Sequence, residues 1–246
     1  MFPLVNLRGA GLRMQVWVTA DVSGMVGLTD SGMLLLQWPG GDWAALGALS
    51  GNRVSGVVGP ADQVAALRAA MDWPDGLVRH ASDEPGYRLE LRDLILPGCS
   101  GYSLNPLSEE VALMVEWRCA YQVEVFAADP DGAMATAARD VARWIAAGSH
   151  RMLRYRGAPV ALSGFNAALP DVVQVGGVYV PPELRGRGHA RRVVGLHLRE
   201  ARAAGVQRAV LFAANEAAAR AYEALGFQPE GRMGLVLFAS PQEVSA

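Results

Sequence analysis

The segment from Val178 to Gly195 contains the residue types that point most directly to chemistry. An apolar strand pattern ends at Val180, two prolines follow, and the sequence Arg-Gly-Arg-Gly at 185–188 leads into a segment with helical periodicity. The first backbone amides of a helix have no partner within it, and the helix dipole favours negative charge there. Glycine also lets a phosphate approach the backbone closely. We therefore expect a site for a phosphate-bearing ligand at this turn.

Two common phosphate-binding loops do not fit this segment. A dinucleotide fingerprint would need a glycine where Arg191 stands, and a Walker A loop needs a lysine, which the chain lacks altogether. The pattern Arg185-x-x-Gly188-x-Ala190 instead resembles the acetyl-CoA signature of the GCN5-related N-acetyltransferase (GNAT) superfamily, Arg/Gln-x-x-Gly-x-Gly/Ala. Taken alone, these residues also fit an ordinary strand-to-helix turn that is rich in arginine.

A second pattern strengthens the resemblance. Residues 215–227 read Asn-Glu-Ala-Ala-Ala-Arg-Ala-Tyr-Glu-Ala-Leu-Gly-Phe and are similar to the second GNAT signature, Asn-x-x-A-x-x-x-Tyr-x-x-x-Gly-Phe. The two signatures occur in the family's order, with a helix pattern and a strand pattern between them. The resemblance covers residues 101–238 well and the first hundred residues poorly. Ala190 stands where many members have glycine, and the signature permits this.

The resemblance implies which residues hold the coenzyme. In this family the loop amides hold the pyrophosphate of coenzyme A, and the strand before the loop splays from its neighbour and bonds the pantetheine arm. Asn215 falls where members often bind the same arm, and Arg187, Arg191 or Arg192 would meet the 3′-phosphate by charge-assisted hydrogen bonds. The backbone positions implied are Val178, Tyr179, Val180, Arg185, Gly186, Arg187, Gly188, His189 and Ala190.

The implied reaction is transfer of an acetyl group from acetyl-CoA to an amine by direct attack. A lysine-like amine has a reference pKa of about 10.4, so forming its neutral state near pH 7.4 costs about 4 kcal/mol and a base would help. Glu124 is the first candidate for this base and Glu116 the second. Tyr222 occupies the position of the family's usual general acid and would protonate the leaving thiolate. Backbone N–H groups near Val180 would stabilise the negative charge on the thioester oxygen.

The candidate base belongs to a predicted helical face with two possible uses. Trp117, Tyr121 and Glu124 are spaced so that they share one side of a helix. In the GNAT layout the first helices lie over the acceptor site, so this face could receive an amine. The same spacing also fits a core-facing stripe with a solvated edge, and both interpretations stay open at this point.

Composition limits the classes of partner. The chain has 246 residues, 51% of them hydrophobic and 19% charged, with a formal net charge of −2, which gives no support for broad binding to nucleic acid or to a membrane surface. No apolar run reaches membrane-spanning length and arginines interrupt the N-terminal segment, so we expect a cytoplasmic protein. Cys99, Cys119 and the scattered histidines lack zinc-type spacing, so we expect reduced thiols and no metal.

The length suits one large domain or two small ones. Turn residues at 97–101 suggest a boundary, with an N-terminal α/β module at 1–98 and a GNAT acetyltransferase domain at 99–246. We expect an α/β (α+β) fold class, in which a mixed, mostly antiparallel central sheet is flanked by helices. The layout also resembles two-domain bacterial GNAT proteins, whose first module is interpreted as a degenerate half of the same fold. A structural or dimer-forming module fits as well, so a homodimer stays open.

Periodicity and turn residues predict the elements that must position the site. In the first hundred residues we expect strands at 15–19, 33–37, 54–58 and 87–96, a short helix capped by Asp42 and a helix opening near Pro60. Further on we expect helices that begin at Ser108 and near Asp131, a hairpin turning at 156–157, strands at 172–180, 208–213 and 231–238, and helices at 190–204 and 216–225.

Three rival interpretations come from other classes. A GNAT-like domain could hold acetyl-CoA as a ligand or sensor without catalysis, and acceptor-dependent thiol release would separate it from an enzyme. A purely structural or interaction protein would bind no coenzyme. An RNA-binding fragment would need aromatic residues interleaved with the Arg-Gly pairs, and these are missing. The acceptor itself, a small molecule or a peptide amine, cannot be chosen from the sequence.

Overall fold

The computed structural model describes residues 6, 8–43 and 49–244. Their contacts group into two units, which we call unit 1 (Met1–Gly86 with Glu230–Ala246) and unit 2 (Tyr87–Pro229). This division differs from the boundary expected at residue 98. Leu89, Leu91 and Leu94 precede that boundary, yet they are buried in the main hydrophobic core of unit 2. The end of the chain, in turn, belongs to unit 1.

Unit 1 contains strands in the order β1-β2-β3-β4-β11-β5. Strands β1 to β3 are antiparallel, β3 and β4 are parallel, and β11 is antiparallel to β4. The elements are β1 (Met14–Val18), β2 (Met25–Thr29), β3 (Met33–Gln37), β4 (Arg53–Pro60), α2 (Ala61–Ala70), β5 (Val78–Glu90) and β11 (Gln228–Glu243).

Three predictions for this part of the chain need comment. Strand β2 was not expected, because it is short and is interrupted by a glycine. The strand expected at 87–96 begins instead at Val78 and ends at Glu90, where a 3₁₀ turn comes next. The helix expected after Asp42 falls largely on residues 44–48, which lie outside the described residues.

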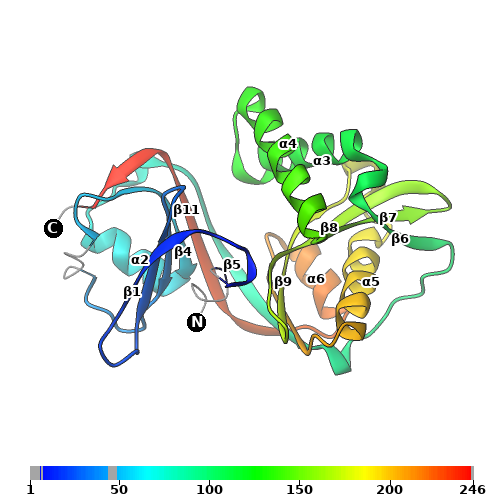
Figure 1. Cartoon of the computed structure of the whole chain (residues 1–246), viewed down its shortest axis with the longest axis horizontal. Coiled ribbons are helices and arrows are strands. Elements are labelled where there is room, and N and C mark those ends of the chain that lie inside the picture. The colour runs from blue at the N-terminus through cyan, green and yellow to red at the C-terminus, as the bar shows by residue number, and fades with distance from the viewer. Residues whose placement is uncertain (1–5, 7, 44–48, 245–246) are drawn as a thin grey trace. The chain divides into compact units, whose positions relative to one another are not determined.

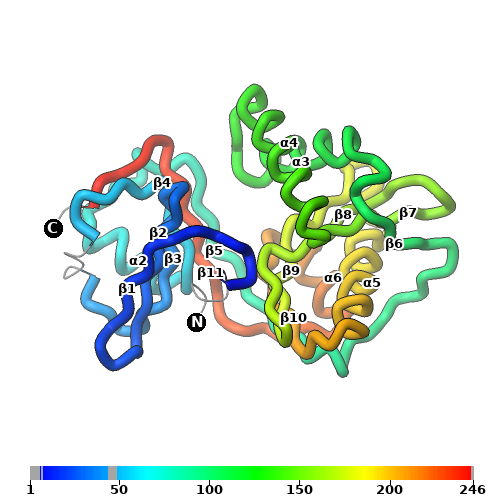
Figure 2. The backbone as a smooth tube through the Cα atoms, viewed as in Figure 1, coloured from blue at the N-terminus to red at the C-terminus, as the bar shows by residue number. Residues whose placement is uncertain are grey.

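Unit 2 contains strands in the order β5-β10-β9-β8-β7-β6, to which β5 contributes only its last residues. Figure 2 labels β6 to β10 in this unit. Strands β6 to β9 are antiparallel and β9 is parallel to β10. The predicted mixed, mostly antiparallel sheet is therefore confirmed. The additional strands are β6 (Tyr102–Pro106), β7 (His150–Tyr155), β8 (Ala158–Ala168), β9 (Val172–Tyr179) and β10 (Arg208–Phe212).

Helices cover both faces of this sheet (Figure 1). Alternation along β7 and β8 explains how both faces are apolar, since Leu153 and Ala161 enter the core under one helix pair while Met152 and Leu162 enter the core under the other. Within the described residues, no helix is both long and apolar enough to cross a bilayer. One pair is α3 (Val111–Phe126) with α4 (Pro130–Ala147), and the other is α5 (His189–Ala203) with α6 (Glu216–Glu223).

The starts of α3 and α4 differ slightly from the sequence prediction. Ser108 lies in a 3₁₀ turn and caps nothing, because α3 begins three residues later with Glu110 at its N-cap position. Helix α4 begins at Pro130, and Asp129 is its cap, accepting a hydrogen bond of 3.2 Å from the backbone N of Gly132. Proline is favoured at the first helical position, where its missing N–H has no partner in any case. Gly148 ends α4 in a left-handed conformation.

The two units repeat one order of connection. In each, three antiparallel strands are followed by a strand parallel to the third, then by a helix and a last strand; β1 to β5 form one series and β7 to β11 the other. The last strands are exchanged, because β11 pairs with β4 in unit 1 while the end of β5 adjoins β10 in unit 2. The backbone N of Leu91 donates to the Gln207 carbonyl at 2.7 Å, directly after that end of β5.

Helices α3 and α4 are joined by an ion pair that water reaches only slightly. Arg118 Nη2 lies 2.7 Å from Asp140 Oδ2, and the two side chains are 16% and 14% exposed. Arg143 contacts the other carboxylate oxygen at 2.9 Å but is 63% exposed. We expect Asp140→Asn to lower the free energy of unfolding by about 2–3 kcal/mol, because the Arg118 charge loses its buried partner.

Chemical denaturation of Asp140→Asn measures this loss. Arg143→Ala is the matched control, since it removes the exposed partner of the same carboxylate and should change stability by less than about 0.5 kcal/mol. Equal effects of the two substitutions would show that burial of the Arg118 pair contributes nothing.

Candidate functional site

Strand β9 leaves its parallel neighbour after three paired positions. The pairs join Arg208 to Val172, Ala209 to Val173 and Val210 to Gln174, and they end there although β9 continues to Tyr179. Beyond Gln174, one edge of β9 therefore has no β10 partner among the described residues. Backbone groups on such an edge can bond an extended ligand, as a sheet edge bonds a peptide strand.

A bulge lies in the same part of β9. Leu162 pairs with Tyr179 and Gly164 with Gly176, so three steps along β9 match two steps along β8. Gly177 takes up the extra residue with φ of +61°, a left-handed conformation that glycine adopts without a Cβ penalty. As a result Val175 enters one core and Tyr179 enters the core on the opposite face of the sheet.

The loop after β9 carries a run of backbone amides with no backbone partner. Among the described residues, those of Gly186, Arg187 and Gly188 donate no backbone hydrogen bond. The amides from His189 to Arg191 open helix α5 and so have no partner within it. Gly186 and Gly188 both have left-handed φ values, +77° and +73°, which turn the chain into the helix. Consecutive unpaired amides at a helix N-terminus make an anion-binding concavity.

Arg185 joins this loop to helix α3. Its Nη2 lies 2.7 Å from Glu124 Oε2, its Nε donates to the Val180 carbonyl at 3.0 Å, and its guanidinium lies 5.9 Å from the centre of the Tyr179 ring. Both charged side chains are nearly half exposed. Burial, with a smaller contribution from Glu124, raises the pKa of Tyr179 and keeps its phenol protonated. The candidate base is thus held by an arginine of the loop.

The other arginines near the loop differ in their contacts: Arg192 holds the loop in place, whereas Arg187 and Arg191 make few hydrogen bonds in the described part of the chain. Arg192 Nε donates to the Gly98 carbonyl at 2.9 Å, and its Nη1 donates to the carbonyls of Arg187 and Gly188 at 3.1 and 3.2 Å. Arg192 therefore fixes the loop, which makes it a poor candidate for the 3′-phosphate. In the described part of the chain, Arg187 donates only to the Glu183 carbonyl, at 3.2 Å, and the buried Nε of Arg191 has no partner.

His189 contributes to the loop through its backbone. Its imidazole is buried, and Nδ1 lies 3.2 Å from the Tyr102 hydroxyl. Burial, followed by the charges of Arg192 and Arg187, lowers the pKa of His189. The side chain therefore packs strand β6 against helix α5 as a neutral ring, and only the amide faces the anion-binding turn.

The aromatic residues of α3 pack on β9. Trp117 and Tyr121 have ring centres 6.1 and 6.4 Å from that of Tyr179, and Trp117 is 8% exposed. This face is core with a charged edge at Glu124. The structure brings Glu124 to the loop, whereas Glu116 lies on α3 as an exposed side chain.

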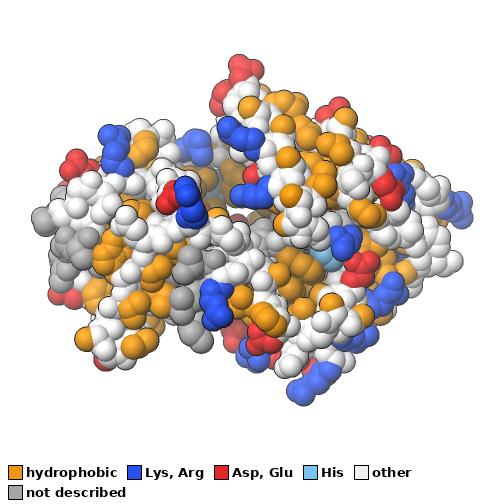
Figure 3. Space-filling view, in the orientation of Figure 1, with side chains coloured by type: hydrophobic (Ala, Val, Ile, Leu, Met, Phe, Trp, Pro, Cys, Tyr) orange, Lys and Arg blue, Asp and Glu red, His pale blue; other side chains and the backbone are white. Residues whose placement is uncertain are grey.

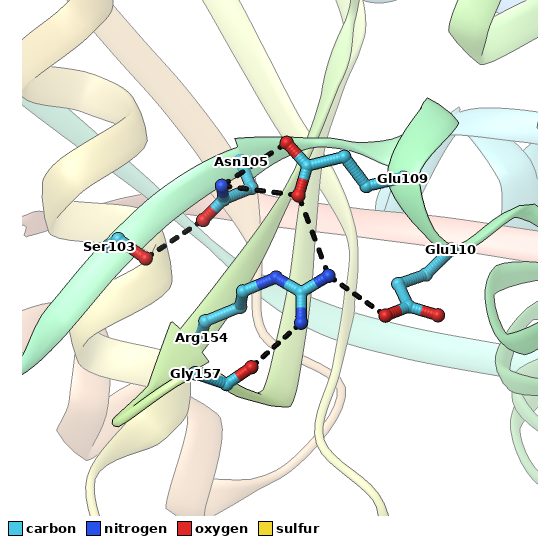
Figure 4. Close-up of polar contacts among 6 residues, drawn as sticks. All are labelled: Ser103, Asn105, Glu109, Glu110, Arg154 and Gly157. Atoms are coloured by element: carbon cyan, nitrogen blue, oxygen red, sulfur yellow. Dashed lines mark hydrogen bonds and ion pairs between the residues drawn. The ribbon is translucent and has the colours of Figure 1, made fainter.

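The start of α3 is held by a polar cluster around Arg154 of β7 (Figure 4). Arg154 Nη2 bonds Glu110 at 2.8 Å and contacts Glu109 at 3.5 Å, while its Nη1 donates to the Gly157 carbonyl at 2.7 Å. Asn105 of β6 also donates to Glu109. These contacts hold the start of α3 against strands β6 and β7 at the edge of the sheet. The same helix carries Glu124.

Helix α6 presents the second sequence pattern. Asn215 is its N-cap, and Oδ1 accepts a hydrogen bond of 2.9 Å from the backbone N of Ala218, which leaves the exposed amide nitrogen as the donor for a ligand. Tyr222 is 6% exposed in the same core as Phe227, with ring centres 6.0 Å apart. Asn215 therefore lies at the protein surface, whereas Tyr222 is buried in the main hydrophobic core of unit 2.

Charge outside the loop is mixed. On the face shown in Figure 3, acidic and arginine side chains lie among one another and form no broad patch of one sign. The ion pairs that join arginines to aspartates and glutamates across unit 2 explain part of this pattern.

Two buried histidines were not predicted from the sequence as parts of the site. His197 of α5 stacks on Phe165 at 3.9 Å between ring centres, with Nδ1 3.4 Å from Ser163 Oγ. His150 opens β7 and stacks on Trp144 at 3.8 Å. The signal that could have marked His150 is the glycine at 164 on the partner strand, because a missing side chain there makes room for a ring.

Comparison with known proteins finds one matching family model and several solved structures with a similar fold. Residues 112–227 match the family model described as "Acetyltransferase (GNAT) family". No curated protein shows significant similarity to the chain. Among solved structures, a GCN5-related N-acetyltransferase from Kribbella flavida is 17% identical, with a TM-score of 0.63 over 97% of this chain and 95% of that chain.

Two further structures share the fold at similar distance. A tandem GNAT protein from the clavulanic acid biosynthesis pathway is 18% identical, with a TM-score of 0.54 over 98% of this chain and 88% of that chain. A GCN5-related N-acetyltransferase from Sphaerobacter thermophilus is 15% identical, with a TM-score of 0.52 over 93% of this chain and 80% of that chain. At these identities the likeness establishes the fold alone.

The buried histidines make stability depend on pH in a predictable direction. Burial, with a smaller contribution from Arg151, lowers the pKa of His197 to about 3. The unfolded chain, with a histidine pKa near 6.5, therefore binds the proton first, and stability falls as pH drops below about 6.5. We expect His197→Phe, which keeps a ring against Phe165, to reduce this slope by up to about 1.4 kcal/mol per pH unit between pH 6 and 4.

Urea unfolding at several pH values gives the slope. The wild-type protein is the reference above pH 7, where the histidine contributes no proton uptake and the variant should show the same pH dependence as wild type. Parallel curves for both proteins between pH 6 and 4 would contradict the neutral, buried state of His197.

Proposed function

We propose that this chain, whose residues 112–227 match the acetyltransferase (GNAT) family model, transfers an acetyl group from acetyl-CoA to an amine by direct attack. One observation carries the proposal. A strand that loses its neighbour leads directly into a loop of unpaired amides, flanked by arginines and closed by the N-terminus of α5. This arrangement suits a long ligand with an extended arm and a phosphate-rich end.

The pyrophosphate would bind the amides of residues 186–190. Binding there adds negative charge beside Arg185, whose guanidinium contacts Glu124 in the free protein. The pyrophosphate would compete for this guanidinium, because a phosphate group offers it charge-assisted hydrogen bonds as a carboxylate does. Arg187 and Arg191 are the remaining candidates for the 3′-phosphate, since Arg192 is committed to backbone carbonyls.

The pantetheine arm would lie along the unpaired edge of β9, at Val178, Tyr179 and Val180. The Val180 carbonyl already accepts from Arg185, so the arm would use the other backbone groups of this segment. Asn215, whose amide nitrogen is free of the cap bond, would donate to the same arm. The thioester would then lie towards the bulge at Gly176 and Gly177, where β9 and β10 have diverged.

The chemical step needs a base, an oxyanion site and an acid. Glu124 is the proposed base, and in this role its carboxylate must first leave Arg185, so donor binding would precede proton removal from the amine. Backbone amides at the diverging part of β9 would stabilise the oxyanion. Tyr222 would give its proton to the thiolate as the carbon–sulfur bond breaks. The acceptor is proposed only as a small-molecule or peptide amine.

A second function uses the same site without transfer. A domain that binds acetyl-CoA as a ligand would need the loop and the strand but neither Glu124 nor Tyr222. The pairing of Glu124 with Arg185 in the free protein favours this alternative, since the carboxylate is occupied by the guanidinium and is not directed at an amine. Release of free thiol that depends on an added amine distinguishes the two functions.

Calorimetric titration with acetyl-CoA is the direct test of the loop. We expect one site per chain with micromolar affinity in the wild-type protein. Gly188→Ala should weaken binding by at least about tenfold, or roughly 1.4 kcal/mol, because the new Cβ would lie 2.6 Å from Arg192 Nη1 and disturb the bonds that fix the loop.

Gly186→Ala is the matched control for the loop. It has the same left-handed strain, but its Cβ would meet no atom within 4 Å, so its effect should be several-fold smaller. Both variants need a thermal unfolding curve to show that they are folded. If the folded wild-type protein does not bind acetyl-CoA, the proposed function is wrong.

Tyr222→Phe tests the acid. The substitution keeps the ring packed beside Phe227 and removes only the hydroxyl, so we expect kcat to fall about 10–1000-fold with little change in the Kd for acetyl-CoA. Thiol release with a panel of primary amines gives the rate. Tyr155→Phe removes a hydroxyl from β7, outside the proposed site, and should leave the rate unchanged. Unchanged turnover in Tyr222→Phe would remove this residue from the mechanism.

A further inference from the structure

One buried polar group lies next to the bulge of β9 and has no role in the site described so far. His150 opens β7, and its imidazole extends across β8 at Gly164, where any side chain would overlap the ring. An added Cβ at Gly177 of β9 would lie 3.3 Å from Nε2 of the same ring. The absence of side chains on two neighbouring strands thus brings an imidazole nitrogen to the bulge.

The ring is held in one orientation. It stacks on Trp144 of α4 with ring centres 3.8 Å apart and an angle of 11° between the planes. Nδ1 lies 2.9 Å from Ser149 Oγ, and His150 is only 2% exposed. Stacking and the Ser149 contact leave Nε2 as the one polar atom of the ring that can serve a ligand.

Nε2 has no hydrogen-bond partner within the described residues, and it is shielded from solvent. Buried polar atoms in native proteins nearly always have a partner, so an exception calls for an explanation such as a missing ligand. The exception lies beside the one segment of β9 that has lost regular pairing on one edge and contains a bulge on the other. Two independent features therefore meet at Gly177.

The chemistry of this nitrogen is that of a neutral ring. Burial lowers the pKa of His150 to about 2, with smaller contributions from His197, Arg118, Arg143 and Arg151, so the imidazole carries no charge near neutral pH. The Ser149 hydroxyl can donate its proton to Nδ1, which places the ring proton on Nε2. An uncharged N–H donor beside the bulge can polarise a carbonyl group without transferring a proton to it.

We propose that Nε2–H of His150 donates a hydrogen bond to the carbonyl oxygen of the acetyl thioester and makes His150 a catalytic residue of the acyl site. This inference rests on the proposed function, because it assumes that acetyl-CoA lies along β9. As the amine nitrogen bonds the acetyl carbon, the π electrons of the carbonyl move to oxygen and the bond from Nε2–H shortens. When the carbon–oxygen double bond re-forms, the carbon–sulfur bond breaks, the electron pair goes to sulfur and Tyr222 supplies its proton. The base removes the extra proton from the amine nitrogen.

The thioester carbonyl itself reports this contact, and no acceptor is needed. Acetyl-CoA labelled with ¹³C at the carbonyl carbon is bound to the wild-type protein and to two variants. We expect a downfield shift of the carbonyl resonance on binding to wild type, because a hydrogen bond withdraws electron density. The shift should fall by at least half in His150→Phe, which keeps a ring on Trp144 without a donor, and should return in part in His150→Gln, which restores an N–H.

Calorimetry distinguishes a contact between His150 and the acetyl group from a role of His150 in packing alone. Coenzyme A without the acetyl group should bind wild type and His150→Phe equally, whereas the preference for acetyl-CoA over coenzyme A should fall about two- to tenfold, the size expected for one neutral hydrogen bond. With any amine that supports thiol release, turnover of His150→Phe should fall on the order of 100-fold, the effect of losing one oxyanion donor.

Three results would overturn the inference. An equal ¹³C shift in wild type and His150→Phe would show that the ring does not touch the carbonyl. Equal weakening of coenzyme A and acetyl-CoA in a folded variant would mean that His150 only shapes the strand. Failure of the wild-type protein to bind either compound would remove the proposed function as well, and this outcome is distinct from the first two.

Discussion

The candidate site depends on the hydrogen bonds that β9 does not make. Pairing with β10 stops at Gln174, and the bulge at Gly177 turns the remaining strand so that Tyr179 faces the helices on the opposite side of the sheet. A regular ladder would have satisfied these backbone groups and closed the space between the strands. In the loop after β9, the amides of residues 186–188 also lack backbone partners among the described residues. The candidate site therefore consists mainly of backbone groups, and the arginine and glutamate side chains around them set its charge.

Local patterns predicted much of this architecture. The hairpin at 156–157, the helix after Gly188 and the helix that begins at Glu216 were correct, because a glycine turn or a capping side chain acts over a few residues. Contacts between distant segments could not be predicted in this way. The pair of Arg185 with Glu124 joins residues 61 positions apart, and Arg192 reaches back 94 positions to Gly98. The site of His150 depends on glycines of two other strands, so a pattern confined to β7 could not reveal it.

Unit 1 repeats the strand order without repeating the site. The third strand of its series, β3, is followed by Trp38, whereas the third strand of the series in unit 2 is followed by the arginine-rich loop. The Trp38 ring occupies the space that side chains at Gly24 and Gly41 would need, and Gln63 accepts from its backbone N at 2.7 Å. After β3, the large Trp38 ring therefore packs against its neighbours where unit 2 has a loop of unpaired amides. The same series of strands can therefore support a binding site or a plain core, depending on the residues that come after the third strand.

The exchange of last strands affects the order in which the chain can fold during synthesis. Residues 87–90 leave the ribosome before the rest of unit 2, so the strand beside β10 is already present when β10 emerges. Unit 1 has no such advantage, because the edge of β4 stays unpaired until residues 233–243 are made. An apolar strand edge left open for most of translation invites pairing with other chains. Synonymous changes that slow translation of the last third of the gene would prolong this exposure, although they alter no contact of the finished protein.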